Sequence, residues 1–192
     1  MRESLSRRST IICAFAAILG STAGFEWWMG RSLFGPDGKP GLWEGDIWSN
    51  ECSQRLADAY SFTHIGHGLV FFGLLWLFAR RLPIRFRFLV AVLLEAGWEM
   101  LENSPIIINR YRETTMALGY SGDSILNSLS DILMMCIGFF LAWRLPLLAS
   151  VMLFVAMEIC CVLWVRDNLT LNVIMLVHPV NAIKVWQMGG HP

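Results

Sequence analysis

Charged residues are scarce in this 192-residue chain: they make up 16% of it, against about 25% in a typical water-soluble domain. Hydrophobic residues account for 55% and form long runs separated by short polar segments. Such runs are typical of membrane-spanning helices. The formal net charge is +0, and no basic stretch interleaved with aromatic residues is present. The sequence therefore predicts a membrane lipid as partner and argues against a nucleic acid.

A disulfide framework is also lacking. The chain has five cysteines, an odd number, and none of them forms a Cys-x-x-Cys pair. Four lie inside apolar runs: Cys13, Cys136, Cys160 and Cys161. We expect these thiols to act as small core residues.

Long apolar segments define the architecture, because a helix needs about 20 mostly apolar residues to cross a bilayer. Five segments qualify: Ile11–Met29, Tyr60–Ala79, Phe86–Asn103, Ile125–Trp143 and Pro146–Val165. A sixth, Leu169–Met188, is broken by His178-Pro179, so it is interfacial or an irregular sixth span. The sequence predicts a single all-α domain over residues 1–192, an integral membrane bundle of about five transmembrane helices plus a membrane-lying C-terminal segment.

Arginines in short loops indicate the orientation of the bundle. The arginines of the N-terminus and the short connectors fall on one side of the membrane: Arg2, Arg7, Arg8, Arg80, Arg81, Arg85, Arg87 and Arg144. The positive-inside rule makes that side cytoplasmic. We therefore expect a cytoplasmic N-terminus, with the loops 30–59 and 104–124 outside.

Two histidines stand in the second span, at a spacing of three residues. His64 and His67 therefore share one helix face. Two imidazoles on one face can bind a single metal ion, or each can bond to a neighbouring helix. Gly66 and Gly68 beside them allow another helix to approach closely.

Three glutamates lie on one face of the third span. Glu95, Glu99 and Glu102 fall within about 60° of arc on an α-helix. Their carboxylates would repel one another unless they are protonated, paired with cations or bound to a metal. This pattern predicts a functional site or a buried polar core.

A second polar stripe opens the fourth span, where Asp123, Asn127 and Asp131 follow one another at four-residue steps. Asp123 is predicted to be the helix N-cap. Asp131 lies about two turns into the membrane, where an ionisable group needs a partner. The acid Asp167, just beyond the fifth span, fits an interfacial and a functional role equally.

Under the predicted orientation, all these polar groups lie in the outer half of the bilayer. A path for protons or ions across the membrane would need groups in both halves. The distribution therefore disfavours a transporter and predicts one outward-facing site.

Several runs of this sequence closely resemble an uncharacterised bacterial family of multi-pass inner-membrane proteins. They are Tyr60–His64 (YSFTH), Glu95–Arg112 (EAGWEMLENSPIIINRYR), Gly119–Asp131 (GYSGDSILNSLSD) and Arg166–Asn172 (RDNLTLN). Together they cover most of the chain from about Ser49 onward. The resemblance implies a location in the bacterial inner membrane. It implies no activity, because the function of the family is unknown.

Two functional hypotheses follow. In the first, a divalent metal supports hydrolysis or transfer on a lipid headgroup. The candidate ligands are His64, His67, Glu95, Glu99, Glu102 and Asp131, with Asn127 beside them, Glu99 and Asp131 as catalytic groups, and Arg110 and Arg112 as lipid-phosphate ligands. In the second, the same residues form a structural hydrogen-bond core in a non-enzymatic lipid- or partner-binding protein. The sequence leaves open whether the protein is an enzyme.

Overall fold

The computed structural model describes residues 2–117 and 119–189 and is almost entirely helical. The helices in these ranges are α1 (Arg2–Trp28), α2 (Ser61–Phe78), α3 (Ile84–Glu102), α4 (Pro105–Thr114), α5 (Ile125–Arg144), α6 (Leu147–Val165), α7 (Leu169–Val177) and α8 (Asn181–Met188). Two short strands, β1 (Trp43–Glu44) and β2 (Ala57–Asp58), pair in parallel within the loop between α1 and α2.

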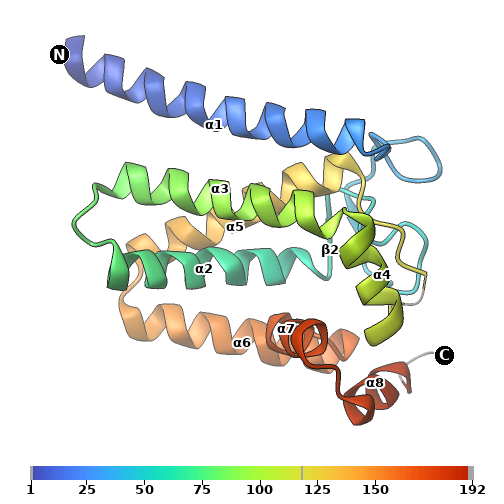
Figure 1. Cartoon of the computed structure of the whole chain (residues 1–192). Helices are drawn as coiled ribbons and strands as arrows, with labels where there is room; N and C mark the ends of the chain where they lie inside the picture. The colour runs from blue at the N-terminus through green and yellow to red at the C-terminus, as the bar shows by residue number, and fades with distance from the viewer. Residues whose placement is uncertain (1, 118, 190–192) are drawn as a thin grey trace.

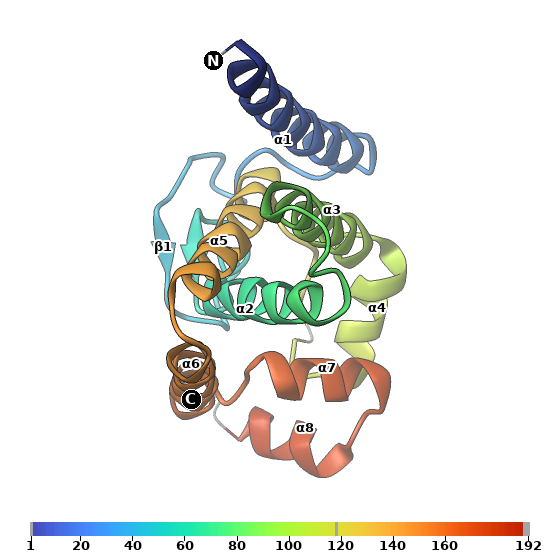
Figure 2. The same ribbon diagram turned by 90° about the vertical axis from the view of Figure 1, so that its left-hand side faces the viewer.

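The five long helices, α1, α2, α3, α5 and α6, lie side by side. The loop between α1 and α2 lies at one end of them, together with α4, α7 and α8 (Figure 1). Seen from that figure's left-hand side, α1 lies on one flank of the group α2, α3 and α5, and α6 to α8 lie on the other (Figure 2). In the described part of the chain, four helices are long and apolar enough to cross a membrane: α1 from Ser9, α2, α5 and α6. The chain is thus a membrane protein with an all-α bundle.

Helix α3 has 19 residues and lies in the bundle, but it carries five charged residues and is not among the four helices apolar enough to cross a membrane. Its first turns carry Arg85 and Arg87, and its later turns carry the three glutamates. Its inward face nevertheless supplies half of the buried core. That core joins Ala91, Val92 and Ala96 of α3 to Ile132, Met135 and Phe139 of α5. Burying one face of α3 against α5 explains how a helix rich in charge packs within an apolar bundle.

The predicted spans agree with the long helices to within a few residues, apart from the extension of α1 to Arg2. The segment 104–124 was expected to be a loop, and this is wrong for its first part, because α4 begins at Pro105. Proline ends α3 and is also favoured in the first turn of a new helix, where its missing N–H costs nothing. The break expected at His178-Pro179 is present, and it separates α7 from α8.

The cysteine prediction needs a correction. Cys161 is buried, but Cys13 and Cys160 are exposed on the outer faces of α1 and α6. Large apolar side chains surround the bundle on these faces as well, for example Leu163, which is 79% exposed. In a membrane protein the outer face is as apolar as the core, because it faces lipid chains. An apolar run therefore does not tell the two faces apart.

Helices α2 and α5 cross at two glycines. A Cβ atom added at Gly68 would lie 2.0 Å from the carbonyl oxygen of Met135, and one added at Gly138 would lie 2.0 Å from that of Ile65. The two backbones are therefore in direct contact at this point. The close approach expected from Gly68 is present, and it brings the histidine face of α2 against α5.

This contact predicts that Gly68→Ala destabilises the protein by about 1–3 kcal/mol, because the added methyl group forces the helices apart. Gly73→Ala is the matched control in the same helix, where a Cβ would meet nothing within 4 Å among the described residues. Thermal unfolding in detergent should show a lower midpoint than the wild type for Gly68→Ala and an unchanged midpoint for Gly73→Ala. Equal midpoints would contradict the backbone contact.

Candidate functional site

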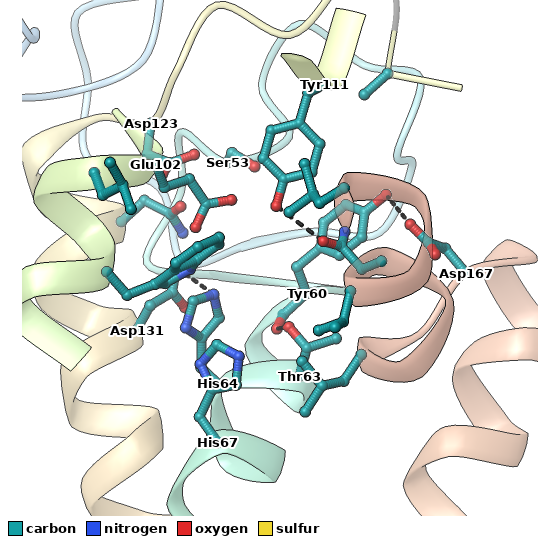
Figure 3. Close-up of a pocket in the computed structure, with 18 of the residues that line it drawn as sticks. Ser53, Tyr60, Thr63, His64, His67, Glu102, Tyr111, Asp123, Asp131 and Asp167 are labelled. Atoms are coloured by element: carbon teal, nitrogen blue, oxygen red, sulfur yellow. Dashed lines mark hydrogen bonds and ion pairs between the residues drawn. The ribbon is translucent and has the colours of Figure 1, made fainter. Parts of the chain in front are cut away.

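A cavity of about 540 Å³ lies between α2, α3, α4, α5 and α7. It is at the end of the bundle that carries α4 and α7 (Figure 1). Polar side chains from separate parts of the sequence line it: Ser53, Tyr60, Thr63, His64, His67, Glu102, Tyr111, Thr115, Tyr120, Asp123, Asn127, Asp131, Asp167 and Asn172. Figure 3 shows His64 and His67 below this space, with Glu102 and Asp123 on one side and Asp167 on the other.

The start of α2 is held by Asp58, which lies buried in the loop before it. Its Oδ1 accepts hydrogen bonds from the backbone N–H groups of Tyr60 and Ser61, at 2.8 and 3.2 Å. Its Oδ2 accepts one from the N–H of Ser53 at 2.8 Å. Burial raises the pKa of this carboxyl, and the three N–H donors act against that rise. Asp58 thus fixes the first turn of α2, from which His64 projects.

Both histidines of α2 contact a single carboxylate of α3. Nδ1 of His64 lies 2.6 Å from Oε1 of Glu95, and Nδ1 of His67 lies 3.0 Å from both carboxylate oxygens. The spacing of three residues places the two rings on the same face, and α3 presents Glu95 to that face. Because Glu95 is fully buried, these ring nitrogens are its partners in a medium where an unpaired charge is costly.

Glu99 lies one turn further along α3 and has a different environment. It is fully buried, and within the described ranges neither carboxylate oxygen has a hydrogen-bond partner. Its Oε1 is 3.4 Å from Nδ1 of His64, which is already engaged by Glu95. A buried carboxylate without a donor costs several kcal/mol unless a proton or a cation joins it. Glu99 is therefore the acid of this site that most needs a further partner.

Asp131 approaches the same histidine from α5. Its Oδ2 lies 3.7 Å from Nε2 of His64, and its Oδ1 accepts a long hydrogen bond of 3.5 Å from the hydroxyl of Ser61. Nδ1 of His64 is committed to Glu95, so Nε2 is the ring nitrogen left for another ligand. Asp131 and Glu99 thus approach one imidazole from two helices, Asp131 at Nε2 and Glu99 at Nδ1.

Two sets of these side chains could hold a metal ion. In each set, the ligand atoms lie within 4.8 Å of one another. One consists of His64, His67 and Glu95, and the other of His64, Glu99 and Glu102. Zinc bound at about 2.0–2.2 Å by imidazole and carboxylate holds its ligand atoms about 3.4 Å apart, so some of these side chains would have to move closer to bind it. Of the proposed metal ligands, His64, His67, Glu95, Glu99 and Glu102 fall in these sets, from α2 and α3, whereas Asp131 of α5 is in neither and lies 3.7 Å from Nε2 of His64.

Asp123 was predicted to be the N-cap of α5, and this is wrong. Ser124 is the N-cap, and its hydroxyl accepts a hydrogen bond from the backbone N–H of Asn127 at 3.2 Å. Asp123 instead accepts from Asn103 Nδ2 at 3.0 Å and from the Tyr120 hydroxyl at 2.9 Å. Burial raises the pKa of Asp123 to about 6. A serine directly after an aspartate can take over the cap, which frees the aspartate for the cavity wall.

Asn127 also has a structural contact. Its side-chain amide donates to the carbonyl oxygen of Arg55 at 2.9 Å and so ties α5 to the loop before α2. It lines the cavity beside Asp131, but it does not contact the histidines through any described hydrogen bond.

Arg110 and Arg112, the proposed lipid-phosphate ligands, donate to backbone carbonyl groups. Nε of Arg110 lies 3.0 Å from the oxygen of Leu176, and Arg112 binds the oxygen of Tyr120. The described lining of the cavity includes neither arginine. Both connect α4 to neighbouring segments, and phosphate binding by them stays a prediction.

The aromatic part of the cavity was not predicted from the sequence. The chain has 12 phenylalanines but three tyrosines, and all three tyrosines line this cavity: Tyr60, Tyr111 and Tyr120. Burial raises the pKa of each phenol well above its usual range. In a membrane protein, a hydroxyl on a buried ring needs a polar neighbour. The rarity of tyrosine beside so many phenylalanines was the available signal.

Asp167 is the acid for which the sequence left an interfacial and a functional role open. Its carboxylate is buried and receives hydrogen bonds from the hydroxyl of Tyr60 at 3.5 Å and from the side-chain amide of Gln187 at 3.0 Å. Burial raises its pKa to about 7. The residue therefore belongs to the cavity rather than to the membrane surface. Its neighbour Asn168 is the N-cap of α7, and its side chain accepts a hydrogen bond from the backbone N–H of Leu171.

Comparison with known proteins identifies the family. A family described as "Protein of unknown function (DUF2585)" matches residues 26–189. A UPF0314 protein of Rhizobium etli is 50% identical, over 92% of this chain and 90% of the relative. One of Sphingopyxis alaskensis is 47% identical over 99% and 100%, and one of Paracoccus denitrificans is 45% identical over 97% and 96%.

No solved structure matches the chain. The resemblance to an uncharacterised bacterial family is confirmed. The chain belongs to the DUF2585 family, as a bacterial membrane protein.

Proposed function

We propose that this protein binds a divalent cation in the membrane and uses it for hydrolysis or transfer on a lipid headgroup. The observation that carries this proposal is the carboxylate of Glu99. It is fully buried, lacks a hydrogen-bond donor among the described residues, and lies with Glu102 beside His64. A divalent cation would supply the missing positive charge.

The ligand set favours a cation held by His64, Glu99 and Glu102, with Asp131 next to it. Glu95 would act from behind by fixing the ring of His64 through Nδ1. A carboxylate behind a metal-binding histidine commonly sets the orientation of the ring in this way. Imidazole with carboxylates suits zinc or manganese.

The chemistry would use the cation to polarise a headgroup oxygen and to activate a nucleophile. Asp131 is the candidate general base, since its 3.5 Å contact with Ser61 leaves the carboxylate weakly engaged. Asp131 and His64 both line the cavity, so a substrate there can reach them. Glu99, the other proposed catalytic group, would act as a ligand.

A structural hydrogen-bond core is the second candidate function. The pairing of Glu95 with both histidines favours it, because these three side chains satisfy one another without a metal. The bonds among Asn103, Asp123 and Ser128 have the same character. Under this alternative the protein would bind a lipid or a partner without catalysis.

The cation proposal predicts that purified protein contains a transition metal and that Glu99→Gln loses it. The loss should be at least as large as the roughly 10–100-fold weakening caused by changes behind a metal ligand. Glu113→Gln, at an exposed glutamate of α4, is the control and should keep the metal. Elemental analysis in detergent measures both.

The metal content of these samples separates the two candidates. If Glu99→Gln leaves the metal content unchanged, the cation proposal is wrong. If the wild type holds no metal even after incubation with zinc or manganese, the structural alternative is favoured.

We propose further that the protein lies in the bacterial inner membrane with its N-terminus in the cytoplasm. The connectors that follow α2 and α5 lie at the same end of the bundle as the start of α1 (Figure 1). They carry Arg80, Arg81 and Arg144. Arginine-rich short connectors favour the cytoplasmic side. The cavity would then open toward the outer leaflet.

Cysteine labelling tests this orientation. Cys52 is a poor reporter, because burial and the carboxylate of Asp58 raise the pKa of its thiol. Lys39→Cys and Arg81→Cys, each at an exposed position in a background without native cysteines, report on the two ends. In intact spheroplasts an impermeant thiol reagent should modify Lys39→Cys but not Arg81→Cys. Arg81→Cys should react only after the spheroplasts are lysed. The opposite pattern would reverse the orientation.

A further inference from the structure

The end of the cavity that faces α4 and α7 combines aromatic rings with carboxylates. Tyr60, Tyr111 and Tyr120 line it together with Glu102, Asp123 and Asp167. Among the described residues of the lining, none is lysine or arginine. A ligand at this end therefore meets negative charge and ring faces.

The geometry of the rings suits a positively charged group. Tyr111 and Tyr120 contact each other edge to face, with their ring centroids 5.3 Å apart and their planes at 78°. Such crossed rings bound a corner of the kind that binds ammonium groups. Figure 3 shows the rings of Tyr60 and Tyr111 between Asp167 on one side and Glu102 on the other. The carboxylates would neutralise the charge that the rings surround.

The wall of the cavity between α2, α3 and α7 is apolar and continues to the outer surface. Val70, Leu94, Leu101 and Val173 line the cavity, and each is at least 38% exposed. In a membrane these side chains face lipid. A molecule with acyl chains can therefore place its polar end in the cavity while its chains stay in the bilayer.

Acidic side chains outnumber basic ones along the described lining of this cavity. Glu99, the carboxylate assigned above to the divalent cation, is not itself part of the described lining. It lies within 4.8 Å of the ligand atoms of His64 and Glu102, which both line the cavity. The acids of the lining are Glu102, Asp123, Asp131 and Asp167, and its basic groups are His64 and His67, so the cavity suits a cationic ligand better than an anionic one.

We infer that this tyrosine–carboxylate end binds the ammonium group of an amine-bearing membrane lipid. The inference names the substrate class of the proposed function and rests on it for the lipid as substrate. The ammonium site itself does not use the divalent cation. The rings and Asp167 supply the recognition, and the apolar wall accommodates the first part of the acyl chains.

Lipid binding in the presence of a chelator tests this inference without the metal. Native mass spectrometry of the full chain in detergent compares dioleoyl phosphatidylethanolamine with dioleoyl phosphatidylglycerol, which share the phosphate and both chains. We expect the ethanolamine lipid to bind about tenfold more tightly or better, as one desolvated cation–π contact supplies. Free ethanolamine should bind more weakly than the lipid, because it lacks the chains. Tight binding of free ethanolamine would show that the site binds a soluble amine, and it would overturn the inference that the ligand is a lipid.

Variants locate the site. Asp167→Asn should lose the preference for the ethanolamine lipid, whereas Asp46→Asn, at an exposed loop carboxylate, should keep it. If Asp167→Asn unfolds, Tyr120→Leu and Tyr120→Phe replace it. The leucine variant should lose the preference and the phenylalanine variant, which retains the ring face, should keep most of it.

Equal binding of the two lipids by the wild type overturns the inference. A preference that survives Asp167→Asn and Tyr120→Leu in folded protein also overturns it. Glu99→Gln separates this result from the proposed function, because that variant should lose the metal and retain the lipid preference. If the protein prefers the ethanolamine lipid but never holds metal, the ammonium site is supported and the proposed divalent-cation function is wrong.

Discussion

The pairing of one buried carboxylate with two imidazoles holds the centre of this bundle together. Glu95 is fully buried on α3, and His64 and His67 of α2 lie 2.6 and 3.0 Å from it. In a low-dielectric interior such a group must find partners, so α2 and α3 have one register in which their polar faces meet. The adjacent contact of Gly68 with the backbone of α5 then brings Asp131 to the opposite nitrogen of His64.

Much of this arrangement follows from periodicity. The spacing of the histidines and of the glutamates predicts the two faces that meet, and the apolar runs predict the long helices. The sequence also predicts the break at His178, because proline disfavours helix in the residue before it. These features depend on contacts within a few residues, or on the bilayer as solvent, and both can be read along the chain.

The parts that were not predicted depend on packing between distant segments. Tyr60, just before α2, contacts Asp167, just before α7. Tyr111 of α4 donates a hydrogen bond to Asn172 of α7 at 2.9 Å. Nothing local in the sequence joins these partners. The N-cap of α5 shows the same limit on a smaller scale, since both Asp123 and Ser124 fit a cap and the contact of Asp123 with Asn103 decides between them.

The distribution of positive charge gives the site its character. Arg110 and Arg112 lie near the cavity in sequence and space, yet their guanidinium groups are held by the carbonyl oxygens of Leu176 and Tyr120. They connect α4 to neighbouring segments and do not neutralise the acidic side chains of the cavity. The described lining therefore leaves its carboxylates to tyrosine hydroxyls, amides and two histidines. A cavity built in this way has room for positive charge from outside the chain, whether as a metal ion beside His64 or as an ammonium group among the tyrosines.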